Sequence, residues 1–88
     1  MSCTVRIASP LRSYTGGRAR VPGEGATLAA VLQDLDRRFP GMRFRMIDEQ
    51  ERIRPHIRLF VGNAESRTLD AAVPAGATVH LICALSGG

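Results

Sequence analysis

Hydrophobic and polar residues alternate in three segments of the chain, and this pattern predicts three strands. In residues 3–8 the apolar side chains stand at positions 3, 5 and 7. Residues 56–61 repeat the alternation, and residues 79–85 form an apolar run with the same period of two. Because successive side chains of a strand point to opposite faces, each segment is expected to bury one of its faces.

Residues 27–39 follow a helical period instead. Apolar side chains recur there at intervals of three and four residues, at Leu28, Val31, Leu32, Leu35 and Phe39. Such a stripe predicts an amphipathic helix whose apolar side lies on the core. Thr27 is the expected N-cap, and Pro40 followed by Gly41 is expected to end the helix.

Glycine and proline divide the remainder of the chain. Residues 9–25 are expected to form turns around a short strand at 18–21, which pairs with the first strand as a hairpin. Residues 42–55 are expected to be an irregular extended segment that turns near residues 48–50. Further turns are expected at residues 62–63 and 74–76. One helix against a mixed sheet is an α+β architecture.

The size and composition are typical of one small globular domain. The chain has 88 residues, of which 44% are hydrophobic and 23% charged. We expect a single domain over residues 1–88, with residues 85–88 as a tail. No apolar run has the length of a membrane span, and the first residues lack a secretory signal. A cytoplasmic protein that is monomeric when free is therefore expected.

The positive net charge of +4 does not by itself predict nucleic-acid binding. All twelve basic residues are arginines, and they are scattered among acidic residues rather than gathered in a stripe or tail. Aromatic residues make up only 5% of the chain, too few for a platform on which bases stack. A generic arginine-rich surface is the favoured interpretation.

Cysteine and histidine offer no catalytic or metal-binding pattern. Cys3 and Cys83 are far apart in the sequence and belong to no Cys-x-x-Cys motif, so neither a metal site nor a disulfide is expected. The position of Cys83 in the alternation points it toward the core, where a thiol stays protonated and inert. His56 and His80 have no serine, cysteine or acid at a suggestive spacing.

The sequence ends in Gly87-Gly88, directly after the last predicted strand. Two glycines are common at a frayed terminus. The alternative is that the terminal carboxylate enters a narrow site on another protein, which glycine permits because it has no Cβ. Four extended residues, 85–88, would reach roughly 13 Å beyond the domain.

Several segments together resemble a known family. They are the helix that ends in Phe-Pro-Gly, the stretch Ile-Arg-Pro-His-Ile-Arg-Leu-Phe-Val at residues 53–61, the turn before the last strand and the final Ser-Gly-Gly. This combination resembles the β-grasp fold of ubiquitin-like proteins. It is most similar to the MoaD/ThiS family of sulfur carriers, in particular those that serve cysteine synthesis. Two turns depart from the family pattern, with Gly62-Asn63 in place of Asn-Gly and Gly76-Ala77-Thr78 in place of Gly-Asp-Glu.

The resemblance implies a protein cosubstrate rather than an enzyme. A partner of the ubiquitin-activating type would use ATP to adenylylate the carboxylate of Gly88, and sulfur would then replace AMP to give a thiocarboxylate. Leu85, Ser86 and Gly87 would form the tail that presents this group. A synthase would accept the sulfur into cysteine, molybdopterin, the thiazole of thiamine or a secondary metabolite. The carrier itself would bind no cofactor and no metal.

The alternation also predicts a docking surface for such a partner. If the helix covers the sheet face that carries Val5, Ile57, Leu59, Val79 and Leu81, the opposite face displays Arg58, Phe60, His80 and Ile82. An exposed Phe beside an exposed Ile is typical of a protein-binding patch. The alternative is that Phe60 is covered by residues 42–54.

Two further functions stay open at this point. One is a covalent modifier that is attached to lysines of other proteins, as ubiquitin is. The residue before the glycines is serine, whereas ubiquitin has arginine there, and this difference favours a carrier. The other is a basic β-grasp module that binds RNA, for which a steep dependence of binding on salt would be diagnostic.

Overall fold

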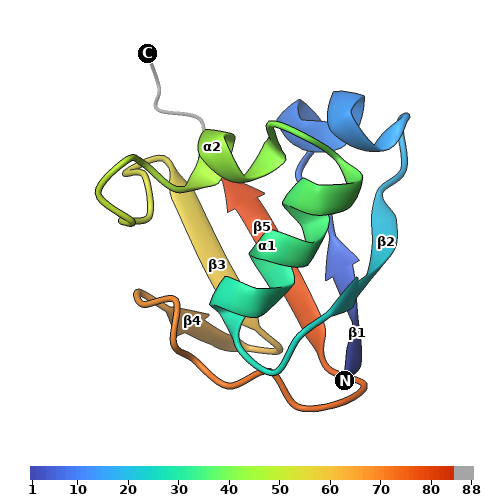
Figure 1. Cartoon of the computed structure of the whole chain (residues 1–88), viewed down its shortest axis with the longest axis vertical. Helices are drawn as coiled ribbons and strands as arrows, with labels where there is room; N and C mark the ends of the chain where they lie inside the picture. Colours follow the sequence, from blue (N-terminus) through green and yellow to red (C-terminus); the bar gives the residue numbers. More distant parts are fainter. Residues whose placement is uncertain (85–88) are drawn as a thin grey trace.

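The chain forms a five-stranded sheet with α1 and α2 on one of its faces (Figure 1). This computed structural model describes residues 1–84. In chain order the elements are β1 (Ser2–Arg6), the 3-10 helix η1 (Ser9–Thr15), β2 (Arg20–Glu24), α1 (Leu28–Arg38), α2 (Met42–Met46), β3 (Ile57–Val61), β4 (Ala64–Ser66) and β5 (Thr78–Cys83). Within this part of the chain, none of the helices is long and apolar enough for a membrane crossing.

The sheet is mixed, and β5 is its central strand. The strand order is β2-β1-β5-β3-β4. The strand β5 runs parallel to β1 and antiparallel to β3, so both of its edges are hydrogen-bonded to neighbours. The outer strands β2 and β4 are each joined to their neighbour by an antiparallel hairpin. The α+β architecture and the antiparallel pairing of the first two strands are confirmed. The second strand runs over Arg20–Glu24 rather than over the expected residues 18–21, because residues 22–24 continue the pairing with β1.

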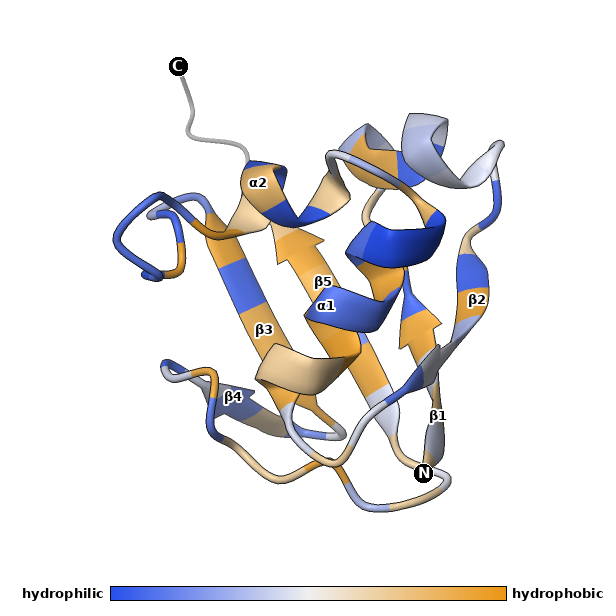
Figure 2. Ribbon diagram, viewed as in Figure 1, coloured by the Kyte–Doolittle hydropathy of each residue, from blue (hydrophilic) through white to orange (hydrophobic). Residues whose placement is uncertain are grey.

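The hydrophobic core lies between α1 and the inner face of the sheet. The predicted helix is confirmed with its cap, because the Ala30 amide donates a 3.2 Å hydrogen bond to Oγ1 of Thr27. The five core-facing strand residues expected from the alternation are all buried: Val5, Ile57, Leu59, Val79 and Leu81. Figure 2 shows β3 as hydrophobic along its length except for one hydrophilic band.

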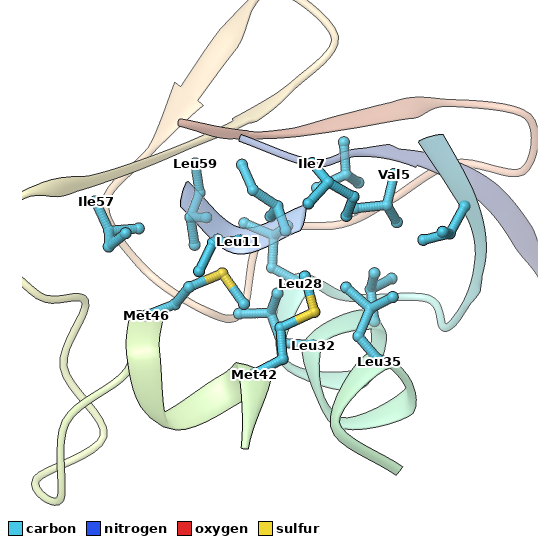
Figure 3. Close-up of a cluster of buried hydrophobic side chains, with 14 of the residues drawn as sticks. Val5, Ile7, Leu11, Leu28, Leu32, Leu35, Met42, Met46, Ile57 and Leu59 are labelled. Carbon is cyan, nitrogen blue, oxygen red and sulfur yellow. The ribbon is translucent and has the colours of Figure 1, made fainter. Parts of the chain in front are cut away.

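The expectation of an extended segment after α1 is wrong at its beginning, because residues 42–46 form the helix α2. Met42 and Met46 lie one helical turn apart, and both are fully buried. Their side chains point from α2 toward the sheet (Figure 3). The carboxylate of Asp36 in α1 accepts hydrogen bonds from the amides of Gly41 and Arg43, each 3.2 Å long. A cap supplied by the preceding helix therefore stabilises the start of this short helix.

Two other elements differ from the expectation. Residues 9–15, expected to form turns, make the helix η1, which buries Leu11 and Thr15. The polar residues 64–66 form the edge strand β4, which returns along β3 through a two-residue turn. Gly62 has a positive φ of 60° there and Asn63 does not, as in a type II′ hairpin turn, so glycine suits the first position.

A buried carboxylate joins α1 to the edge of the sheet. Asp34 is only 7% exposed and accepts a 3.1 Å hydrogen bond from the Glu24 amide in β2. It also forms ion pairs with Arg37 and Arg38, the latter at 2.8 Å. Burial by itself would raise the pKa of Asp34, but the hydrogen bonds from the two arginines and the amide outweigh it and hold the pKa below its usual value.

We predict that Asp34→Asn lowers the free energy of unfolding by about 1–2 kcal/mol at pH 7, since it removes hydrogen bonds to a charged group. The pKa of Asp34 is depressed in the folded state, so its contribution is complete above the pKa of the unfolded chain, about 4, and is lost as pH falls. Urea unfolding between pH 3 and pH 7 measures this. The difference from the unmodified protein should shrink toward pH 3, and Glu49→Gln should show no such difference. A gap of constant size across this range would contradict the assignment.

Candidate functional site

The end of β5 is the point from which the predicted tail departs. The amide of Ala84 donates a 2.7 Å hydrogen bond to the carbonyl of His56, and Cys83 pairs with Ile57. The chain is thus held beside the start of β3 up to its last described residue, at the end of the molecule opposite the N-terminus (Figure 1). The predicted tail residues Leu85, Ser86, Gly87 and Gly88 lie outside the described residues.

Two surface features flank this departure point. A shallow groove is lined by residues 8–10, by Arg12 and by residues 81–83. A second depression lies beside α2, where Phe44 is 56% exposed and the guanidinium carbon of Arg54 stands 4.6 Å from the centre of its ring. Sequence reasoning missed Phe44 because it treated this segment as extended. The four-residue spacing of Met42 and Met46 was the available sign that this segment is helical.

The four residues predicted to contact a partner are brought together on the outer face of the sheet. Strand register places Arg58 opposite Ile82 and Phe60 opposite His80. Ile82 is 41% exposed and Arg58 is exposed, whereas Phe60 and His80 are half-buried. The Arg58–Ile82 pair is the nearer of the two to the end of β5. We call this group the outer patch: Arg58, Phe60, His80 and Ile82.

The alternative position for Phe60, beneath residues 42–54, does not fit the structure. Its strand neighbour Leu59 is fully buried in the core with Met42 and Met46 of α2. Phe60 is absent from the residues that pack on that core, and the alternation of β3 places it on the opposite face. Its register neighbours on that face are His80 and Glu65.

Arg58 and Glu65 form an ion pair that was not predicted from the sequence. This ion pair orders one side of the outer patch. Arg58 donates two hydrogen bonds to the carboxylate of Glu65 in β4, of 2.7 and 3.0 Å. These bonds hold the pKa of Glu65 below its usual value. The guanidinium carbon of Arg58 lies 5.8 Å from the centre of the Phe60 ring, within range of a cation–π contact. Because β4 was not expected, the sequence offered no reason to place Glu65 beside Arg58.

The surroundings of both cysteine thiols disfavour the thiolate form. Both cysteines are free. Burial raises the pKa of Cys3, and the negative charges of Glu24 and Asp34 raise it further. Cys83 is only half-buried, less than its inward position predicts, and burial raises its pKa as well. Among residues 1–84, no cluster of three or more His, Cys, Asp or Glu side chains is arranged to hold a metal ion.

Comparison with known proteins finds close relatives over the whole length. The sulfur carrier protein CysO of Mycobacterium tuberculosis is 32% identical over 93 residues, covering 100% of both chains, and that of Mycobacterium bovis is equally similar. No family model matches the chain.

Solved structures agree with these relatives. A chain in the crystal structure of the Amycolatopsis orientalis BexX/CysO complex has a TM-score of 0.90 and 32% identity, covering 98% of this chain and 99% of its own. Mycobacterium tuberculosis CysO has a TM-score of 0.89 and 30% identity, covering 94% and 99%. Both confirm the ubiquitin-like β-grasp fold. SAMP1 from Haloferax volcanii, with a TM-score of 0.84, 22% identity and 100% coverage of both chains, shows a shared fold alone.

The assignment of the two sheet faces predicts losses of stability that differ in size for substitutions at two adjacent residues. Leu59→Ala should lower the free energy of unfolding by about 2–5 kcal/mol because it leaves a cavity in the core. Phe60→Ala should lower it by about 1 kcal/mol or less, since only cross-strand contacts on the outer face are lost. Chemical denaturation of both variants measures the contrast. Equal losses would show that Phe60 is a core residue.

Proposed function

The chain belongs to the family of CysO sulfur carrier proteins, and we propose that it carries sulfur on the carboxylate of Gly88 for the synthesis of a sulfur-containing small molecule. The observation that carries the proposal is 32% identity to CysO over the full length of both chains. Cysteine is the favoured product, because residues 53–61 resemble the same stretch in carriers that serve cysteine synthesis.

The proposed cycle has two chemical steps. A partner enzyme of the ubiquitin-activating type, which binds the ATP, joins the Gly88 carboxylate to AMP and releases pyrophosphate. A sulfide equivalent then attacks the acyl carbon and AMP leaves, which yields the thiocarboxylate. A carboxylate needs this activation because it is a poor electrophile, whereas AMP in a mixed anhydride is a good leaving group.

The tail sequence suits entry into an enclosed active site. Glycine has no Cβ and tolerates backbone angles that other residues avoid, so Gly87 and Gly88 would pass where a side chain would collide. The hydrogen bond between Ala84 and the carbonyl of His56 fixes the base of the tail on the folded body. A body that docks outside while the terminus reacts within would gain rate from positioning.

The described residues support a carrier whose chemistry is supplied by other proteins. Both cysteine thiols have raised pKa values, so they would be protonated near neutral pH and poorly suited to hold the transferred sulfur. We therefore assign the sulfur to the C-terminal carboxylate rather than to a thiol.

We assign the outer patch as the contact surface for the activating enzyme. Phe60 and Ile82 supply apolar area, and Arg58, held by Glu65, supplies an ordered polar rim. A relative from Amycolatopsis orientalis was crystallised in complex with a second protein, BexX, which is a precedent for a partner complex in this family. A sulfur-accepting synthase would be a second partner and would receive the same tail.

The tail proposal predicts strict dependence on the position of the carboxylate. One appended alanine would displace it by about one residue, roughly 3.5 Å, and should lower adenylylation about 100-fold or more. Gly87→Val should do the same by steric block. ATP–pyrophosphate exchange with the activating enzyme measures the first step, and intact mass detects the replacement of oxygen by sulfur. Ser86→Ala is the matched control and should retain exchange. Normal exchange and sulfur gain by the extended chain would refute the proposal.

The thiols provide an independent prediction. The double variant Cys3→Ala with Cys83→Val should still gain one sulfur atom at its C-terminus, because neither thiol takes part in the proposed cycle. Intact-mass spectrometry after incubation with the activating enzyme, ATP and a sulfide source measures the product. Circular dichroism checks that the variant remains folded. A folded variant that fails to gain sulfur would move the chemistry to a cysteine.

A further inference from the structure

The outer face of the sheet carries a row of basic side chains beside the outer patch. Register places Arg20 of β2 opposite Arg6 of β1, and Arg6 opposite His80 of β5. The same row continues to Phe60 of β3, which pairs with His80. Arg6 and Arg20 are both exposed. We call Arg6 and Arg20 the arginine pair.

The arginine pair is unfavourable for the isolated protein. Side chains directly opposite each other on antiparallel strands are close neighbours, about 4.5–5.5 Å apart at Cβ, and like charges in that position are destabilising. Among residues 1–84, no carboxylate forms an ion pair with either arginine. The other arginines on the sheet and helices are often neutralised, as Arg37 and Arg38 are by Asp34 and Arg58 is by Glu65.

Neighbouring carboxylates on the outer face are already engaged elsewhere. Glu24 lies at the far end of β2 and pairs with the N-terminal amino group at 3.4 Å. Glu65 lies at the opposite edge of the sheet and pairs with Arg58. The outer face therefore has two halves. The half on β1 and β2 has an uncompensated positive charge, and the half on β3 and β5 combines the apolar side chains of Phe60 and Ile82 with His80 and the ion-paired Arg58.

We propose that the arginine pair is the electrostatic half of the docking face and that the activating enzyme carries a matching pair of carboxylates. This inference rests on the proposed function and identifies the chemistry of the partner surface. Carboxylates opposite Arg6 and Arg20 would relieve their mutual repulsion only in the complex. Guanidinium groups suit this role because they hydrogen-bond carboxylates through two parallel N–H groups.

A protein partner fits this face better than a nucleic acid does. The arginine pair is compact: its register neighbour on β5 is His80, and the aromatic ring of Phe60 lies one strand further on. Nucleic-acid surfaces neutralise a longer series of phosphates and stack bases on several aromatic rings. The combination of a small charged area with an apolar area is typical of a protein interface with a core and a polar rim.

The expected consequence is faster association rather than faster chemistry. Charge complementarity at a rim mainly raises the association rate, and the effect declines as salt screens it. The arginine pair should therefore contribute to kcat/KM for the carrier at low ionic strength. It should contribute little to kcat at saturating carrier, where association no longer limits the rate.

The test compares two double variants that remove the same charge. Arg6→Gln with Arg20→Gln removes the arginine pair. Arg52→Gln with Arg67→Gln removes two exposed arginines that lie outside β1, β2 and β5 and serves as the control. ATP–pyrophosphate exchange with the activating enzyme gives kcat and kcat/KM for the carrier at 20 mM and 500 mM NaCl, concentrations chosen so that screening lengths differ by about fivefold.

The first variant should lose about tenfold or more in kcat/KM at low salt, with kcat within about twofold and the difference largely gone at high salt. The control should stay within about threefold of the unmodified protein. Thermal unfolding distinguishes a docking role of the arginine pair from a structural role. Removing a like-charge pair should leave the melting temperature unchanged or higher. Arg6→Lys with Arg20→Lys should restore most of the low-salt rate.

Three results would overturn the inference. Equal rates for the two double variants would show that the arginine pair has no special part in docking. Normal exchange by Arg6→Gln with Arg20→Gln, together with selective loss of binding to a fluorescent 20-nucleotide polyuridine, would identify a nucleic-acid surface instead. An unmodified protein that supports no exchange at all would overturn the proposed function and this inference with it.

Discussion

The central position of β5 is the constraint on which the rest of the structure depends. Its two edges are hydrogen-bonded to β1 and β3, so its backbone is fixed and its side chains alternate strictly between the two faces. Val79 and Leu81 are thereby directed into the core under α1. His80 and Ile82 are directed outward by the same geometry. The direction of the strand also decides where the chain emerges, because Ala84 is held beside His56 at the end opposite the N-terminus.

This arrangement separates the residues that stabilise the fold from those assigned to recognition. The inner face is packed by aliphatic side chains and by Met42 and Met46, and Asp34 ties α1 to the edge strand β2. The outer face bears an uncompensated arginine pair, which costs the free protein stability, and exposed apolar area, which is typical of an interaction site. A small carrier tolerates this cost because its core does not share those residues, and a partner surface would offset it.

How much of the candidate site is predictable depends on whether the signal is local. Alternation within β3 and β5 correctly put Arg58, Phe60, His80 and Ile82 on one face. It could not show that Arg58 meets Glu65 or that Arg6 stands opposite Arg20, because these contacts depend on which strands are neighbours and in what register. The helix α2 was missed for a related reason. Five residues are too few for a clear period, and the cap of that helix is supplied by Asp36 in the preceding helix.

The sequence by itself determined the long periodic elements, the face on which the residues of β1, β3 and β5 lie, and the resemblance to sulfur carriers that full-length relatives support. Each of these features depends on the pattern of residues within a single segment of the chain. Only the tertiary structure decided the strand order, the short helices η1 and α2, and the joining of the arginine pair to the outer patch. Those features arise from contacts between residues distant in sequence, whose free energies depend on packing and pairing that no single segment contains.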